Sequence, residues 1–291
     1  MIRFFSNSTV FVSRLFMKPQ KKLFIAILLL LCSFPAGLHA ATAFDYSSWD
    51  AFLKKNVDEK GNVDYQSVAR DPKELDGFLT TLMSVNEQEM TSWPREEMLA
   101  FWLNAYHAAL IKQVVENYPV ASVQKIPSFW DIALFHIGRE AKEQSQYSLN
   151  DIRVKSLIEV YRDEKIHLAL SMAAKGGPKL MREAFTGSKV EGQLFLLTRQ
   201  FVKDPAYVNI VPGRKKIQIS KIFKWYAKDF KLDFGTPEPR AKFSDNDNAV
   251  LSFLAYYLED EAKGEYLQDA KYKIEYPPFD WSLNDWKKEA A

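Results

Sequence analysis

The chain has 291 residues with a formal net charge of +2, and 47% of its residues are hydrophobic. This length suits one large domain or two small ones, and the aromatic content of 14% can supply a sizeable core. The near-neutral balance gives no electrostatic case for binding nucleic acid or an anionic membrane surface.

Residues 1–40 have the pattern of a secretory signal peptide, with basic residues, then a short apolar run over 23–32, then small residues up to Ala40. The run is shorter than the roughly 20 apolar residues that a transmembrane helix needs. We therefore expect cleavage after Ala40 or Ala43 rather than an uncleaved anchor, and no stable membrane span afterwards. Met17 is an alternative start, because the signal reads well from there.

The single cysteine, Cys32, lies within this segment. Cleavage leaves a mature chain without a thiol, which excludes disulfides, thiolate metal sites and cysteine nucleophiles. Loss of residues 1–40 also removes five cations and no acid, so the formal charge falls from +2 to about −3. The sequence thus predicts an exported protein, located in the periplasm or secreted.

The first elements after the signal read as helices over 47–55, 72–85 and 87–90, because apolar residues recur there at helical spacing. A turn at 58–62 and a short extended piece at 63–65 separate the first two helices. The turn superficially resembles a calcium loop. Its oxygen-bearing residues do not alternate as the loop requires, so we expect no calcium there.

The most apolar helix is expected over 94–117. Ser92 is a good N-cap, and Pro94 is tolerated in the first turn. Residues 99–111 are apolar nearly all round, which indicates a central, buried helix. Pro119 marks its end.

The second half begins with a capping-box pattern at Ser148 and Asp151, which predicts a helix to about residue 161. Residues 165–174 are apolar and short, so helix and buried strand both remain open until the Gly-Gly-Pro turn at 176–178. The remaining expected elements are helices over 189–203, 222–229 and 246–258, a hairpin over 207–210 and 216–219, and a strand over 272–276.

These elements predict an α+β fold, a helix-dominated single domain with short β-hairpin or sheet elements over 44–286, preceded by the signal peptide. No βαβ repeat is visible. The polar, proline-containing segment 231–245 reads as a surface loop rather than a linker, because the chain after residue 245 is too short for a domain.

Three polar residues interrupt the buried helix: Asn104, Tyr106 and His107. Asn104 and His107 are three residues apart and share a helix face. Polar groups in so apolar a helix need hydrogen-bond partners. They are interpreted either as the floor of a binding site or as a satisfied core network that fixes helix packing.

A second candidate lies before the Gly-Gly-Pro turn, where His167 and Ser171 are four residues apart. On a helix they would be neighbours, and on a strand they would point to one side. Either geometry permits the Ser–His contact that nucleophilic catalysis requires. The alternative is a buried histidine with its hydrogen bonds made.

Metal and nucleotide signatures are missing from the sequence. The histidines left after cleavage, His107, His136 and His167, are too widely spaced for a local zinc motif. There is no His-Glu-x-x-His run, no Gly-x-Gly-x-x-Gly, no P-loop and no Gly-x-Ser-x-Gly elbow. We expect no metal and no cofactor, although a zinc site assembled from distant residues stays open.

Five short motifs, in this order, resemble the DUF547 domain proteins: Phe101 to Tyr106, Ser148 to Ile152, His167 to Pro178, Ser220 to Tyr226 with Asp229 and Phe230, and Asp280 to Asn284. The resemblance extends over residues 44–286. It implies a mostly bacterial, often exported domain whose activity is not established.

The resemblance also shows departures. Members of the family usually carry cysteine where this chain has Met172 and Gly177, commonly glutamate at Arg153, and commonly asparagine at His107. A thiol-based mechanism is therefore excluded here. The polar residues retained from the family are Asn104, Tyr106, His167, Asp280 and Asn284, and together with His107 they are candidates for binding or catalysis.

These departures favour an exported, non-catalytic binding or scaffold module, a pseudoenzyme that binds a protein or an envelope component. The alternative is a hydrolase or acyl-transfer enzyme with His167 as general base and Ser171 or water as nucleophile. In that mechanism Asn104 or the backbone of Gly176 and Gly177 would stabilise an oxyanion.

Overall fold

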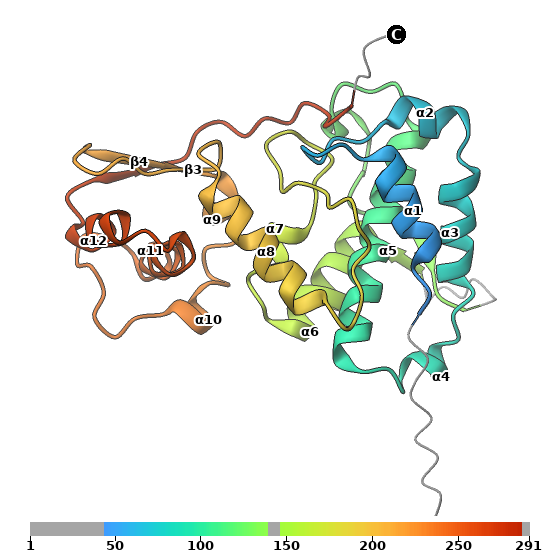
Figure 1. The fold of residues 1–291 in the computed structure, drawn as a ribbon, viewed down its shortest axis with the longest axis horizontal. Helices are drawn as coiled ribbons and strands as arrows, with labels where there is room; N and C mark the ends of the chain where they lie inside the picture. The colour runs from blue at the N-terminus through green and yellow to red at the C-terminus, as the bar shows by residue number, and fades with distance from the viewer. Residues whose placement is uncertain (1–43, 139–145, 287–291) are drawn as a thin grey trace, which may run out of the picture. The chain divides into compact units, whose positions relative to one another are not determined.

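Helix α5 (Arg95–Glu116) is the longest helix among residues 44–138 and 146–286, the residues that this computed structural model describes (Figure 1). It is buried on nearly all sides, as its continuous apolar sequence predicts. Ser92 does not cap it, because its hydroxyl donates to the carbonyl of Glu89 at 2.7 Å and Pro94 occupies the N-cap position. The expected N-cap is thus wrong, although the expected helix is confirmed.

Around α5 lie α1 (Ser47–Asn56), α2 (Tyr65–Arg70), α3 (Lys73–Met83) and α4 (Glu87–Met90), and α2 and α3 contact α5 directly. Trp49 of α1 stacks between Phe52 and Phe78, with ring centroids 5.1 and 4.9 Å away. These side chains belong to the larger of two hydrophobic cores. Helix α2 was not predicted from the sequence.

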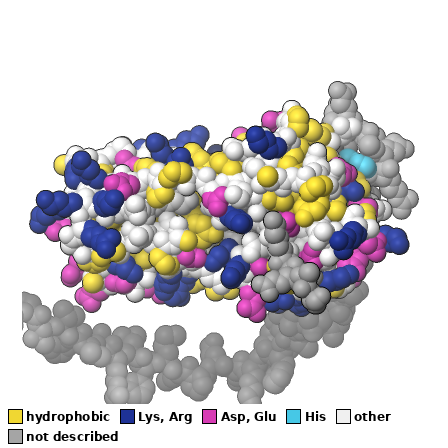
Figure 2. All heavy atoms as spheres, turned by 90° about the horizontal axis from the view of Figure 1, so that it is seen from above, with side chains coloured by type: hydrophobic (Ala, Val, Ile, Leu, Met, Phe, Trp, Pro, Cys, Tyr) yellow, Lys and Arg dark blue, Asp and Glu magenta, His cyan; other side chains and the backbone are white. Residues whose placement is uncertain are grey.

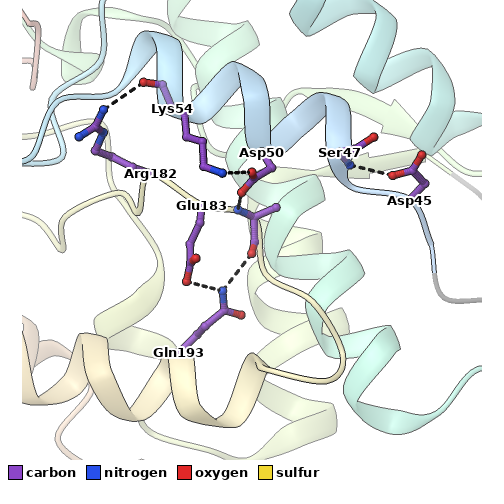
Figure 3. Close-up of polar contacts among 8 residues, drawn as sticks. Asp45, Ser47, Asp50, Lys54, Arg182, Glu183 and Gln193 are labelled. Carbon is purple, nitrogen blue, oxygen red and sulfur yellow. Dashed lines mark hydrogen bonds and ion pairs between the residues drawn. The ribbon is translucent and has the colours of Figure 1, made fainter.

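Helix α1 is also tied to a segment that is distant in sequence (Figure 3). Asp50 accepts a hydrogen bond from the backbone N–H of Ala184 at 3.1 Å, and Arg182 donates to the carbonyl of Lys54 at 3.2 Å. Gln193 of α8 (Val190–Lys203) donates to the carbonyl of Ala184 at 2.9 Å. The segment before α8 is therefore fixed from both sides.

A second core is built by a small sheet and the helices that pack on it, and α11 and α12 lie beneath the sheet in Figure 1. Its elements are β3 (Val208–Asn209), β4 (Lys216–Ile219), β5 (Lys273–Glu275), α9 (Lys221–Trp225), α10 (Lys231–Phe234), α11 (Asp245–Leu258) and α12 (Glu261–Asp269). Strand β4 pairs antiparallel with β3 and parallel with β5. The hairpin and the last strand are as predicted, whereas the parallel pairing and α12 are not.

The segment 231–245 is mostly exposed, as expected of a surface loop, with two departures from that expectation. It starts with α10, and Arg240 is buried against α11 and α12. The Arg240 guanidinium donates to the carbonyl of Leu267 at 2.9 Å and to Asn248 Oδ1 at 3.3 Å. The buried acceptors of two helices explain why a charged residue lies inside here.

A short hairpin of β1 (Ala133–His136) and β2 (Gln146–Ser148) leads into the next helix. The capping box is confirmed: the Ser148 N–H donates to Asp151 Oδ2 at 3.0 Å, and the Asp151 N–H donates to Ser148 Oγ at 3.1 Å. The helix continues as the π-helix η3 (Asp151–Ile158) and then α6 (Glu159–Tyr161). The π winding was not foreseen.

Residues 165–174 adopt neither a full helix nor a strand. They form a single helical turn, α7 (Ile166–Ala169), after which Leu170 is extended. A further short turn, η1 (Val123–Lys125), comes after α5. The helix-dominated α+β class is thus confirmed for the described residues, while the predicted signal peptide lies outside them.

The described helices are each too short or too polar to cross a membrane. On the face shown in Figure 2, cationic and anionic side chains are interspersed with hydrophobic ones. This mixture agrees with the nearly neutral composition of the chain.

Candidate functional site

A cleft of about 270 Å³ has walls from both hydrophobic cores. Five of its lining side chains are aromatic: Tyr106, Trp130, Trp225, Tyr226 and Trp281. The other five are Asn150, Arg153, His167, Leu170 and Met172. A concave, mostly apolar surface with a few polar groups is typical of small-molecule sites.

His167 of α7 lines this cleft, and its imidazole is 2% exposed. The ring stacks on Tyr226 with centroids 4.0 Å apart, and Nε2 is 2.9 Å from Asp229 Oδ2. Burial lowers the pKa of His167 below its usual value, and Asp229 opposes this only in part. The contact with His167 holds the pKa of Asp229 below its usual value. At pH 7 the ring is neutral and its Nε2–H donates to an ionised carboxylate.

Arg153 projects from η3 into the same cleft. Its Nη1 donates to the hydroxyl of Tyr226 at 3.2 Å, and its Nη2 donates to Asn150 Oδ1 at 2.9 Å. Within the described ranges it makes no ion pair. The neutral partners fix the guanidinium in place without neutralising its charge.

Asn104 lies away from the cleft, in the larger core. Its Oδ1 accepts from the Phe185 N–H at 3.0 Å and from Trp49 Nε1 at 3.1 Å, and its Nδ2 donates to the Phe185 carbonyl at 2.8 Å. The amide thus pairs with a backbone segment much as a neighbouring strand would. With these groups engaged, Asn104 has no role at the cleft surface.

His107 and Ser171 contact each other rather than His167. His107 Nε2 accepts a hydrogen bond from the Ser171 N–H at 3.2 Å, and burial lowers the pKa of His107 to about 4. The Ser171 hydroxyl accepts from the Ala173 N–H at 3.3 Å, and Tyr106 donates to the Ser171 carbonyl at 2.9 Å. This arrangement is that of a satisfied core network. Tyr106 links the network to the cleft, since its ring lines the wall.

The two predicted residues near the C-terminus lie outside the aromatic cleft. Asp280 accepts from the Ser282 N–H at 2.9 Å, and it borders a different cavity beside Lys175. Asn284 accepts from the Tyr65 hydroxyl at 2.9 Å and donates to the Gly61 carbonyl at 3.1 Å. Asn284 therefore joins the C-terminal segment to the start of the domain.

The backbone N–H groups considered for an oxyanion hole are already engaged. Gly176 donates to the Asp280 carbonyl at 2.9 Å, and Gly177 donates to the Ala174 carbonyl at 3.0 Å. A Cβ at Gly176 would approach the backbone N of Asp280 to 2.8 Å, so the two segments need this glycine to pack. His136, at the end of β1, lines neither the cavity beside Lys175 and Asp280 nor the aromatic cleft.

A second cavity of about 530 Å³ shares four wall residues with the cleft, namely Arg153, His167, Trp225 and Tyr226. Its other walls carry both acids and bases. Glu164 is buried there, and its Oε2 has no hydrogen-bond partner among the described residues. Burial raises the pKa of this carboxyl to about 7.

Across the described part of the chain, no three His, Cys, Asp or Glu side chains are placed so that they could hold a metal ion. The lining side chains carry a guanidinium, a neutral imidazole, an amide, two phenol hydroxyls and three indole N–H groups. This set of donors is suited to hydrogen bonding and charge recognition.

Several residues in or beside the cleft were not predicted from the sequence. Trp225, Tyr226, Asp229 and Trp281 all lie within the motifs of the family resemblance, yet their place in or beside the cleft was not inferred. The order of these motifs along the chain was the signal that could have pointed to them. Trp130 belongs to none of these motifs and had no comparable signal.

The comparison with protein families agrees with this resemblance. Residues 90–202 match the family model described as "Protein of unknown function, DUF547". The chain contains a DUF547 domain. The chain matches no curated protein and no solved structure.

The match to the DUF547 model covers less of the chain than the motifs do. It includes α5, η3, α7 and all but the last residue of α8, and thus both Arg153 and His167. The residues that complete the cleft from the other side, Trp225, Tyr226 and Trp281, lie beyond it. The cleft is therefore formed jointly by the DUF547 match and by segments C-terminal to it.

Proposed function

We propose that this DUF547 protein is an exported, non-catalytic binding module whose binding site is the aromatic cleft. The observation that carries the proposal is the composition of the walls. None of the described residues that line the cleft is a serine, threonine or cysteine. Covalent catalysis of the Ser–His or Cys–His kind lacks its nucleophile there.

The form of the cleft supports a small ligand or the end of a chain molecule. Its volume is about 270 Å³, and its aromatic side chains offer flat apolar faces. Such rings bury a large area and favour stacked or edge-on contact with another flat group. In an exported protein, the available ligands would be envelope components or their breakdown products.

Export itself is tested by the mass of the protein recovered from cell fractions. We expect a chain that begins at residue 41 or 44, found outside the cytoplasm. Recovery of the whole chain from the cytoplasm would contradict export without affecting the proposal that the cleft binds a ligand.

One observation supports a second function, that of a hydrolase with His167 as general base. The contact between Asp229 and His167 orients a neutral imidazole in the wall of the cleft, and a general base acting on water requires such an oriented ring. Against this function, the imidazole is almost completely buried. Ser171 makes a poor nucleophile in this mechanism, because it is 1% exposed and bonds to the His107 side of the core.

Native mass spectrometry with soluble fragments of the cell envelope separates the two functions. A binding module retains a fragment of unchanged mass, and Trp281→Ala reduces the retained fraction. A hydrolase instead releases shortened products, and His167→Gln abolishes their formation. Turnover that depends on His167 would overturn the non-catalytic proposal.

A further inference from the structure

The cleft and the second cavity differ in the charges on their walls, although they share four residues. The second cavity carries the carboxylates of Glu159, Asp163, Glu164 and Asp229 together with cationic side chains. In the aromatic cleft, the ten lining residues include one permanent charge, that of Arg153. His167 adds none at pH 7, because burial lowers its pKa.

Arg153 also has free hydrogen-bonding capacity. A guanidinium has five N–H donors in a planar fork. Two contacts are made with neutral oxygens, those of Tyr226 and Asn150. The remaining donors have no hydrogen-bond partner among the described residues, so they are available to a ligand.

No described carboxylate forms an ion pair with Arg153, although its charge helps to lower the pKa of Asp229. Asp229 bonds to His167 and lines the second cavity rather than the aromatic cleft. Asp151, on the same helix as Arg153, forms an ion pair with Lys155 at 2.7 Å and accepts from Ser148. The guanidinium therefore lines the cleft without an ion-pair partner among the described residues.

We infer that the cleft binds a ligand with an anionic group, a carboxylate or a phosphate, next to a flat apolar group, and that Arg153 holds the anion while the tryptophans hold the flat group. This inference rests on the proposed binding function and specifies its ligand class. Arginine matches both anions through paired N–H donors. The flat group is expected to contact Trp130, Trp225 or Trp281, which line the same space.

The test uses four small probes of similar shape: benzoate, phenyl phosphate, neutral benzamide and cationic benzylammonium. The readout is the movement of the indole N–H resonances in NMR spectra of the purified protein. Tryptophan-to-phenylalanine variants at the three cleft positions assign the signals. We expect benzoate or phenyl phosphate to bind about five to ten times more tightly than benzamide, with benzylammonium weakest.

Variants at Arg153 give the matched control. In Arg153→Gln, the preference for benzoate over benzamide should disappear. Arg153→Lys should keep the preference for anions but bind them more weakly, because an ammonium lacks the planar fork. Unchanged urea unfolding of both variants confirms that they fold.

The outcomes separate the inference from the function on which it rests. Equal binding of benzoate and benzamide would overturn the anionic ligand class but leave the binding cleft. Tighter binding of benzylammonium would overturn it too. If no probe moves the resonances of the three cleft tryptophans, both proposals fail. A preference between benzoate and phenyl phosphate identifies the anion.

Discussion

Two histidines of this protein lie in neighbouring parts of the fold and have different environments. His107 in α5 is bonded to the backbone of Ser171 inside the larger core. His167 in α7 is bonded to the carboxylate of Asp229 and lines a cleft. Both rings are buried and neutral at pH 7, since burial lowers both pKa values.

The comparison shows that burial alone does not distinguish a structural histidine from one at a site. The two kinds of histidine differ in the hydrogen-bond partner of the ring and in whether a cavity lies beside it. A backbone partner in a sealed core supports packing, whereas a carboxylate partner beside a cavity can orient a ring toward a ligand. Substitutions in the core and at the cleft test this contrast, beginning with the one that should cost the most stability.

Replacing Asn104 should cost far more stability than replacing the cleft asparagine Asn150. Asn104→Ala removes three hydrogen bonds and leaves buried groups of Trp49 and Phe185 unpaired. We expect the free energy of unfolding to fall by about 3–4 kcal/mol. Asn150→Ala, at a more exposed position, should cost about 1 kcal/mol or less. Urea unfolding measures both, and equal losses would contradict the contrast between core and cleft.

Acid should destabilise the protein chiefly through His107. Its pKa is about 4 in the folded protein against an ordinary 6.5, so below pH 6.5 only the unfolded chain takes up the proton. The contribution of His107 to the free energy of unfolding should therefore fall by about 3 kcal/mol as pH falls from about 6.5 to about 4.

His107→Gln retains an acceptor for the Ser171 N–H and should flatten this dependence on pH. His167→Gln should flatten it less, because Asp229 favours the protonated ring and offsets part of the effect of burial. Urea unfolding at a series of pH values measures the slopes. A larger effect at His167 than at His107 would reverse the comparison.

Glu164, beside the cleft, should change stability in the opposite direction. Its pKa is about 7 in the folded protein against an ordinary 4.5, so the folded protein keeps a proton that the unfolded chain loses. The contribution of Glu164 to the free energy of unfolding should fall by about 2 kcal/mol as pH rises from about 4.5 to about 7, which offsets part of the His107 contribution. Glu164→Gln should remove this decline. An identical decline in the variant would show that another group is responsible.

Arg153→Gln is expected to have the smallest effect on stability, within about 0.5 kcal/mol, because Arg153 makes no ion pair with the described residues. It should nevertheless raise the pKa of His167, since the guanidinium charge opposes protonation of the ring. NMR titration of the histidine ring protons measures this shift. An unchanged pKa of His167 would show that the two side chains are electrostatically independent.

Much of the local structure could be predicted from the sequence. The capping box at Ser148 and Asp151 formed as expected, because its hydrogen bonds join residues three apart. The continuous apolar run of α5 predicted a buried helix, and alternation predicted the β3–β4 hairpin. Local patterns gave no sign that Arg240 is buried, because its acceptors lie in two later helices, α11 and α12.

The candidate site was predicted less well. Spacing placed His167 near Ser171, but the structure pairs His167 with Asp229 and Ser171 with His107, partners more than 60 residues away. Tyr106 and His167 do line the cleft, whereas Asn104, Asp280 and Asn284 lie elsewhere. A contact between distant residues leaves no periodic trace in a single sequence.

The sequence by itself determined the helix-dominated α+β character, the buried central helix and the match of residues 90–202 to the DUF547 pattern, because each depends on local spacing or on the order of motifs. Only the tertiary structure decided which histidine faces a cleft and which charge that cleft presents. Packing brings η3, α7, α9 and the C-terminal segment together, and only there does the guanidinium of Arg153, which has no ion-pair partner among the described residues, meet the aromatic walls.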